Sequence, residues 1–257
     1  MKKTAGIDIG TYSIKLIELE EQKGRLDLAL CAEQIIEKED VKLALKDMLA
    51  PLKPHLKNVN ISLSGHSVVV RYIEMPPMRK DELKSAVKFE AEKYIPFDIN
   101  DSIIDCTALD KTSSGSQRVL VAVAKKGVVN NLLEIFKEFN LEIMVVDIDC
   151  FALLNSFQRT GVEKDGRTYA LINLGHAFSN MNIVTGNSVY FTRDIMWGGT
   201  NITNRIKDVM VLNPHEAEAL KRNPGEKRQQ VIDVIMPVID RYISQIRMSF
   251  DYFESQF

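Results

Sequence analysis

The chain has 257 residues, in which 33 Lys and Arg nearly balance 35 Asp and Glu, so the formal net charge is −2. This balance excludes nucleic-acid binding that depends on overall positive charge. Hydrophobic residues make up 45% of the chain and charged residues 26%, which is typical of a globular protein and not of a disordered one.

Cysteine and histidine usage predicts neither disulfides nor a structural metal site. Cys31, Cys106 and Cys150 lie in apolar stretches without CxxC spacing, so we expect reduced core thiols. The four histidines show no zinc-ligand spacing.

Residues 1–4 lead straight into a strand, and apolar runs such as 119–124 are far shorter than the ~20 residues that span a bilayer. We therefore expect a cytoplasmic protein that reaches a membrane only through partners.

The first fifty residues predict three strands followed by a helix. Short alternating runs at 5–10, 14–19 and 25–29 indicate a meander of strands. A helix is expected at 40–52, with Asp40 as its N-cap.

A small α+β insert is expected next. It combines short apolar strands with two helices whose apolar residues recur at spacings of three and four. The expected strands are 58–65, 67–75, 103–109, 118–124 and 142–148, the helices are 79–94 and 128–139, and a polar turn lies at 111–116.

The second half repeats the order of the first. Asp8 and Asn173, which lie near the end of the first strand of each copy, are 165 residues apart, and a repeated unit is stronger support than either copy alone. The expected elements are strands at 169–175, 181–184 and 188–192, a hairpin turn at 186–187 and a helix at 200–209.

Residues 226–257 predict one long helix, in which Pro237 introduces a kink. Apolar residues recur along one face of this helix, and we expect no later strand to cover them. They are Ile232, Ile235, Ile239, Tyr242, Ile243, Ile246, Phe250 and Phe253.

The first strand turn is a candidate phosphate-binding loop. A glycine lets the backbone approach closely, and the N–H groups and hydroxyls of a tight turn can form an anion-binding nest. A lysine there could neutralise a β-phosphate, and an aspartate could hold Mg²⁺ through water. The alternative is a plain hairpin with an exposed lysine. The residues concerned are Asp8, Gly10, Thr11, Tyr12, Ser13 and Lys15.

The second strand turn supplies a matching loop. A nucleotide clamped by two related loops would lie at a domain interface, where small ligands bind preferentially. Its candidate residues are Asn173, Gly175, His176 and Ser179, although His176 also fits an ordinary exposed turn position.

These paired loops are similar to the phosphate-1 and phosphate-2 motifs of the actin/Hsp70/sugar-kinase superfamily. Within it, the sequence resembles the PilM family of cytoplasmic actin-like proteins of the type IV pilus inner-membrane platform, on the branch that includes the cell-division protein FtsA. The resemblance covers nearly the whole chain, and residues 95–98 are its most family-specific stretch. It rests on residues 6–19, 74–76, 90–97, 146–149, 191–195, 198–199 and 216–221.

The resemblance implies an α/β, actin-like ATPase fold of two ribonuclease H-like halves, with an FtsA-type α+β insert (subdomain 1C) and with the C-terminal end missing. Residues 1–67 and 143–165 would form subdomain 1A, and residues 68–142 subdomain 1C. Residues 166–257 would form an incomplete second half, comprising 2A and part of 2B.

The resemblance also implies ATP and Mg²⁺ as ligands between the halves, with at most weak ATPase activity. The implied partner is a PilN-like inner-membrane protein, whose cytoplasmic N-terminal tail would dock in a groove between 1A and 1C. Other pilus platform and motor proteins are further candidate partners. Five residues could frame the groove, although the aromatic ones at 94 and 97 fit core positions as well. They are Arg71, Tyr72, Tyr94, Ile95 and Phe97.

Four more residues are candidates for nucleotide contact. Gly198 and Gly199 could allow a close backbone approach, or could simply open a helix. Glu218 and Lys221 share a helix face and, by the resemblance, could touch the ribose; the alternative is a surface ion pair.

The second loop and the C-terminal end depart from the family pattern. Asn173 stands where the family usually has Asp, which removes a carboxylate from the Mg²⁺ neighbourhood and weakens the case for hydrolysis more than for binding. Ser179 replaces a Thr and keeps the hydroxyl. The Gly-Gly-rich adenosine motif and a final helix are absent, because the pair at 198–199 comes too early. The alternatives are a nucleotide-free scaffold resembling GspL of type II secretion and, less favoured, a small-molecule kinase.

Overall fold

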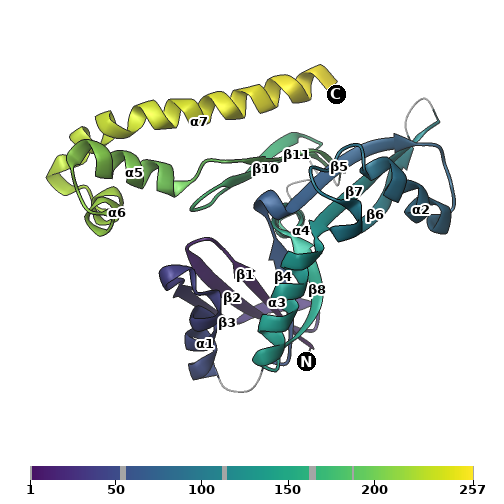
Figure 1. Ribbon diagram of the computed structural model, residues 1–257, viewed down its shortest axis with the longest axis horizontal. Helices are drawn as coiled ribbons and strands as arrows, with labels where there is room; N and C mark the ends of the chain where they lie inside the picture. The colour runs from purple at the N-terminus through teal and green to yellow at the C-terminus, as the bar shows by residue number, and fades with distance from the viewer. Residues whose placement is uncertain (1, 53–55, 112–114, 162–165, 187, 257) are drawn as a thin grey trace. The chain divides into compact units, whose positions relative to one another are not determined.

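The computed structural model describes residues 2–52, 56–111, 115–161, 166–186 and 188–256 (Figure 1). Contacts divide the chain into two units, Met1–Ala152 and Leu153–Phe257, each of which is described by itself. Parts of the predicted turns at 111–116 and 186–187, and Phe257 of the predicted last helix, lie outside the described residues.

The first unit is built on a five-stranded sheet in the order β3-β2-β1-β4-β8. The first three strands form the predicted antiparallel meander, and β4 and β8 run parallel to β1. The strands are β1 (Lys2–Ile9), β2 (Ser13–Gln22), β3 (Arg25–Ile35), β4 (Asn58–Leu63) and β8 (Glu142–Ile148).

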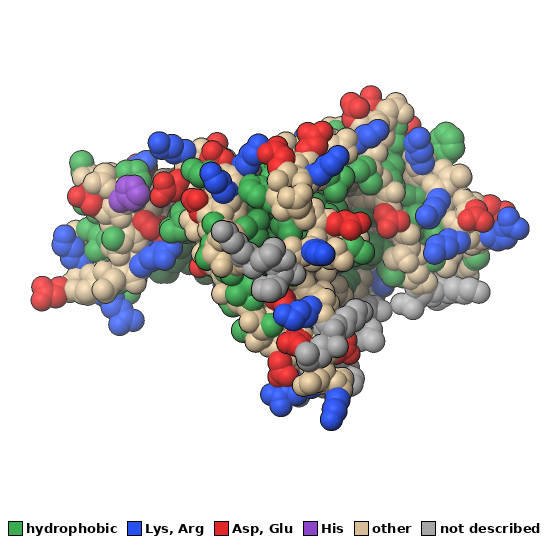
Figure 2. Space-filling model, turned by 90° about the horizontal axis from the view of Figure 1, so that it is seen from below, with side chains coloured by type: hydrophobic (Ala, Val, Ile, Leu, Met, Phe, Trp, Pro, Cys, Tyr) green, Lys and Arg blue, Asp and Glu red, His purple; other side chains and the backbone are tan. Residues whose placement is uncertain are grey.

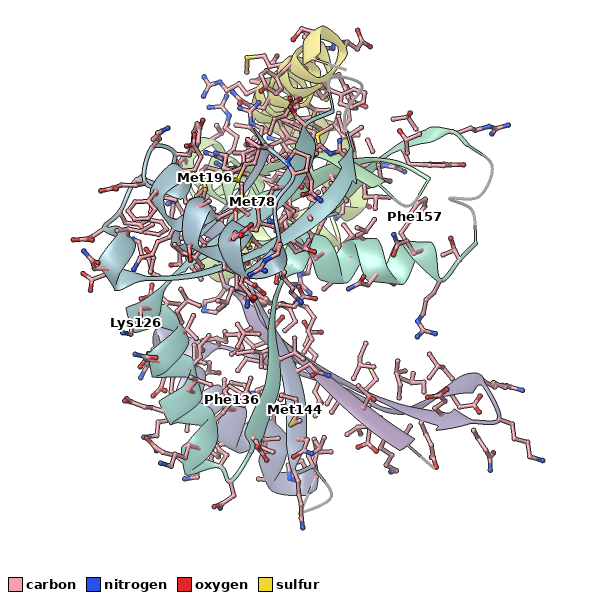
Figure 3. The ribbon with its side chains drawn as sticks, turned by 90° about the vertical axis from the view of Figure 1, so that its right-hand side faces the viewer. Met78, Lys126, Phe136, Met144, Phe157 and Met196 are labelled. Atoms are coloured by element: carbon pink, nitrogen blue, oxygen red, sulfur yellow. The ribbon has the colours of Figure 1, made fainter. Side chains whose placement is uncertain are left out.

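Two helices, α1 (Val41–Leu49) and α3 (Lys126–Glu138), bury their apolar stripes against one face of this sheet. Phe136 of α3, labelled in Figure 3, is fully buried in the shared cluster. The predicted N-cap is confirmed, because Asp40 Oδ1 accepts a hydrogen bond from the Leu43 N–H at 2.9 Å.

A second, antiparallel sheet in the order β5-β7-β6 forms the predicted insert within the first unit. Leu83, Val87 and Ala91 of α2, at helical spacing, pack against Val119 and Val121 of the central strand. The elements are β5 (Val68–Met75), α2 (Lys80–Ala91), β6 (Ser102–Lys111) and β7 (Gln117–Lys125).

The described part of the second unit contains an antiparallel sheet in the order β11-β10-β9, together with helices. α4 (Asp149–Gln158), which the sequence pattern did not predict, spans the division between the units. The other elements are β9 (Thr168–Leu174), β10 (Ser179–Thr185), β11 (Ser188–Ile195), α5 (Gly199–Met210), α6 (Pro214–Arg222) and α7 (Arg228–Gln256). Short 3₁₀ turns lie at Glu37–Glu39, Ala50–Leu52, Gly65–Ser67, Ile99–Asp101 and Gly225–Lys227.

Helix α7 confirms the long C-terminal helix, and its helical conformation continues through Pro237. The aromatic rings of Trp197 and Tyr242 stack with centroids 4.3 Å apart, and Arg193 on β11 donates to Gln245 and Ser249 on α7. Part of the apolar stripe of α7 is therefore packed within its own unit.

The expectation of three core thiols is wrong for one cysteine. Cys150 is buried and Cys106 is half-buried, but Cys31 is exposed on β3. β3 is the edge strand of its sheet and its side chains alternate between partly buried and exposed, which an apolar neighbourhood in the sequence does not reveal.

Candidate functional site

The first candidate loop is a tight hairpin between β1 and β2. The Gly10 N–H donates to the Ser13 carbonyl oxygen at 3.1 Å. A Cβ placed on Gly10 would lie 3.0 Å from that same oxygen, so the turn itself favours glycine. Thr11 at the tip is exposed, while the Tyr12 carbonyl accepts a hydrogen bond from the Ile36 N–H at 2.8 Å.

The charged pair of this hairpin sits directly across the two strands. Asp8 and Lys15 are register partners, and the Lys15 Nζ lies 3.0 Å from the Asp8 Oδ2. Both side chains are about half exposed, so the pair contributes little to stability. Each charged group can therefore exchange its partner for a ligand of opposite charge at small cost.

The hydroxyl of Ser13 is already engaged. Ser13 is buried, and its Oγ donates to the Glu33 Oε1 at 2.7 Å. This bond ties β2 to β3, so in this conformation the hydroxyl serves the sheet.

A second carboxylate, which the sequence motifs did not indicate, lies at the same sheet edge. Because β1, β4 and β8 are parallel, their carboxyl ends meet at one edge, where ligands of open α/β sheets bind. Ile61 on β4 pairs with Ile7 on β1, so the next residue, Ser62, is level with Asp8. Asp147 on β8 pairs with Ser62 and therefore lies at the same level of the sheet as Asp8. Burial raises the pKa of Asp147.

The second candidate loop reproduces the first at an offset of 165 residues. The Gly175 N–H donates to the Phe178 carbonyl oxygen at 3.1 Å, as Gly10 does to Ser13. A Cβ on Gly175 would lie only 2.5 Å from the Phe178 oxygen, so no other residue fits there without a backbone shift. The predicted internal repeat is therefore confirmed at the level of single hydrogen bonds.

The start of α5 closes over this loop. The Gly199 N–H donates to the Gly175 carbonyl oxygen at 2.9 Å, and the Thr200 N–H donates to the His176 carbonyl oxygen at 2.8 Å. A Cβ on Gly198 would meet three backbone atoms of Gly175 and His176 at 2.5–2.7 Å. The Gly-Gly pair therefore lets two segments of the protein's own backbone meet.

Glu218 and Lys221 form a hydrogen-bonded cluster with α5. The Lys221 Nζ lies 2.6 Å from the Glu218 Oε2 and donates to the Thr203 Oγ1 at 2.9 Å. The same Glu218 oxygen accepts from the Thr203 hydroxyl at 2.6 Å. Both charged side chains are about one-fifth exposed, so the predicted i,i+3 pair is more enclosed than a surface ion pair. Burial and then the Lys221 charge lower the pKa of His176 in the adjoining loop.

The Glu218 cluster predicts a dependence of stability on pH. Burial alone would raise the pKa of Glu218, but hydrogen bonds from Lys221, Thr203 and Arg222 outweigh it and lower the pKa to about 2. A carboxyl group whose pKa is lower in the folded protein than in the unfolded one stabilises the folded state when the pH is above its ordinary pKa. For Glu218 this contribution is about 3 kcal/mol. That contribution is lost as the pH falls from about 4.5 towards 2.

We therefore expect Glu218→Gln to lower the free energy of unfolding at pH 7, and the loss to shrink by more than half at pH 3. Urea unfolding of both proteins at the two pH values measures this difference. Glu226→Gln, at an exposed position outside the cluster, is the matched control. An equal loss at both pH values would contradict the assignment.

Asn173 belongs to a row of polar side chains across the second sheet. Its Nδ2 donates to the Asn180 Oδ1 at 3.4 Å, and the Asn180 Nδ2 donates to the Asp194 Oδ1 at 2.5 Å. Asp194, which the sequence motifs did not place in the site, brings a carboxylate into this row. Ser179 is fully buried and donates to the Trp197 carbonyl oxygen at 2.6 Å, so its hydroxyl holds the loop to the Trp197–Gly198 segment.

The five residues predicted to frame a partner groove lie in two places of the insert. Arg71 and Tyr72 are on β5, where the Arg118 guanidinium lies 5.8 Å from the Tyr72 ring centroid. The others follow α2: Ile95 and Phe97 pack partly against the core of the insert, and Tyr94 is exposed and donates to the Glu90 Oε1 at 3.4 Å.

Membrane-spanning helices and clustered metal ligands are both absent from the described part of the chain. Across the described ranges, the helices are too short or too polar to cross a bilayer. Within the same ranges, no three side chains of His, Cys, Asp or Glu gather as candidate metal ligands.

The chain is similar to known proteins along nearly its whole length. The family model described as type IV pilus assembly protein PilM matches residues 6–256. The chain belongs to the PilM family. A solved structure described as a PilM-PilN type IV pilus biogenesis complex matches with a TM-score of 0.88 at 26% identity, covering 99% of this chain and 78% of that chain.

More distant matches share the fold of this chain. EutJ, the ethanolamine utilization protein of Carboxydothermus hydrogenoformans, matches with a TM-score of 0.58 at 11% identity, over 98% of this chain and 72% of that one. Cell division protein FtsA of Streptococcus pneumoniae serotype 2 (strain D39 / NCTC 7466) is 22% identical over 287 residues, 94% of this chain and 62% of that protein. The chain thus spans about three-fifths of FtsA. The predicted actin-like α/β fold and the PilM and FtsA resemblance are confirmed.

Proposed function

We propose that the chain is an ATP-binding, actin-like adaptor of type IV pilus assembly that docks the cytoplasmic tail of a PilN-like inner-membrane protein. The observation that carries the proposal is the match over 99% of the chain to a structure described as a PilM-PilN complex. Residues 1–67 and 143–165 would act as subdomain 1A, 68–142 as 1C, and 166–257 as 2A with part of 2B. The protein would work at the cytoplasmic face of the inner membrane through its partner.

The two glycine hairpins are the proposed nucleotide contacts. Lys15 and Asp8, only weakly held by each other, would turn to a phosphate and to hydrated Mg²⁺ respectively. Asp147, level with Asp8 at the sheet edge, would add a second carboxylate to the metal's surroundings. Mg²⁺ supplies charge neutralisation for the phosphates when bound. Lys221 and Glu218 beside the second loop are the proposed ribose contacts.

A nucleotide-free scaffold is the second candidate function. It is favoured by the engaged hydroxyls of Ser13 and Ser179, by the amide at Asn173, and by glycines whose tight contacts are to the protein's own backbone. Neither function requires hydrolysis.

A thermal-shift titration separates the two functions. Under the ATP-binding proposal, Mg-ATP raises the melting temperature in a concentration-dependent way, by mass action. Mg²⁺ with adenosine is the control, because it lacks the phosphates that Lys15 would contact. No shift with Mg-ATP would overturn the nucleotide part of the proposal and favour the scaffold.

A further inference from the structure

Between α2 and β6 of the insert lies an elongated groove that the proposed function does not use. Two adjoining cavities of about 290 and 360 Å³ share Lys84 and Cys106 in their linings. The first cavity extends to Lys88 on α2 and to Ser102 on β6, and the second extends to Lys80 on α2 and to Ala108 on β6. The helix and the strand therefore run antiparallel along the groove. The floor is partly apolar, with Met78, Leu83, Ile99 and Ile104.

One wall of this groove is an open sheet edge. In the described residues β6 pairs only with β7, so one side of its backbone has no strand beside it. The Cys106 N–H donates to the Asp105 Oδ1 at 2.9 Å, and from this side-chain partner we infer that the N–H faces the open side and not β7. Because peptide groups of a strand alternate in direction, Ser102, Ile104 and Ala108 present theirs to the same open side. Such an edge is a template for an added strand.

The other wall is a row of positive charges. Lys80, Lys84 and Lys88 are exposed and lie four residues apart, about 6 Å along the axis of α2. Among the described residues none of the three has an ion-pair partner. Figure 2 shows the surface of the insert at its right, where Lys and Arg side chains are interspersed with Asp and Glu. Alternate residues of a strand are about 6.6 Å apart, so acidic side chains at every second position match this row.

We propose that the α2–β6 groove binds an extended acidic segment of a partner protein, which adds to the edge of β6 as a strand. Its acidic side chains, at alternate positions, face the three lysines. On binding, the Cys106 N–H exchanges the Asp105 carboxylate for a carbonyl oxygen of the added strand. The released carboxylate repels acidic side chains on the opposite face of that strand. The charge pattern therefore fixes which side of the segment faces α2.

The test uses the full chain and a fluorescein-labelled Glu-Val-Glu-Val-Glu-Val-Glu peptide. Fluorescence anisotropy is expected to show binding that weakens at least tenfold in Lys84→Glu and is unchanged in Lys46→Glu, an exposed helix position with the same charge change. The peptide with Pro in place of Val lacks a backbone N–H at every second position and cannot pair as a regular strand, so it is expected not to bind. Hydrogen exchange is expected to slow in residues 102–108 on binding.

Three results would overturn the proposal: no binding of the Glu-Val peptide, equal binding of the Pro peptide, or binding without slower exchange in β6. The first would show that the lysine row is only a solvated face. The other two would show charge attraction without strand addition. None depends on nucleotide or on a PilN-like tail, so the proposed function is tested separately.

Discussion

Replacing Lys15 with alanine is expected to weaken Mg-ATP binding roughly 10- to 100-fold. A hydrogen bond to a charged group is worth about 1.5–3 kcal/mol, and 1.4 kcal/mol corresponds to a factor of ten. The present partner of Lys15 is Asp8 at 3.0 Å, with both side chains about half exposed. Breaking that pair costs little, so the folded state should keep its stability. Isothermal titration calorimetry of both proteins with Mg-ATP measures the difference.

Lys42→Ala is the matched control for this prediction. Lys42 is an equally exposed lysine of the same unit, paired with Glu138 and outside the hairpin. It should bind Mg-ATP like the unchanged protein. Unchanged affinity in Lys15→Ala, beside measurable binding by the unchanged protein, would remove the first hairpin from the nucleotide site.

The largest effect on stability is expected from Gly198→Ala. The added Cβ would lie 2.5 Å from the His176 oxygen and 2.7 Å from the Gly175 oxygen, both of which are backbone atoms. Relieving that overlap moves α5 away from the loop and strains the two hydrogen bonds from Gly199 and Thr200. Overpacking costs about 1–3 kcal/mol, and each hydrogen bond adds about 1 kcal/mol. We expect the melting temperature to fall by roughly 10 °C.

Gly127→Ala separates this effect from the general effect of adding a methyl group. Gly127 lies in α3, and a Cβ there meets nothing within 4 Å. Alanine is favoured over glycine in a helix by about 0.5–1 kcal/mol, so this variant should be slightly more stable. If Gly198→Ala had the same melting temperature as the unchanged protein, the close packing of the Gly-Gly pair on the second loop would be wrong.

Much of the fold could be predicted from local pattern. The two strand meanders follow from alternating apolar residues, and the offset of 165 between Asp8 and Asn173 reappears in the paired turns at Gly10 and Gly175. Such features depend on neighbours in the sequence. Helix α4 could not be predicted in this way because it follows β8 directly, without a turn signal between the two elements.

Side-chain partners across strands could not be predicted. The sequence makes the turn hydroxyls of Ser13 and Ser179 candidate phosphate contacts, but Ser13 donates to Glu33 and Ser179 donates to the Trp197 carbonyl oxygen. The sequence motifs do not indicate Asp147, because its position level with Asp8 and two strands away follows from the parallel order of β1, β4 and β8. Strand order is a tertiary property, and sequence spacing does not state it. The carboxyl ends of parallel strands were the signal that could have found Asp147.

The proposed docking of the tail of a PilN-like protein on this PilM-family chain is tested most directly by titration. A fluorescein-labelled peptide with the cytoplasmic N-terminal sequence of the PilN-like protein is followed by anisotropy as the full chain is added. The account predicts saturable binding that weakens in Tyr94→Ala and not in Phe89→Ala, an exposed aromatic residue of α2 outside the predicted groove. The absence of saturable binding by the unchanged protein would contradict the account.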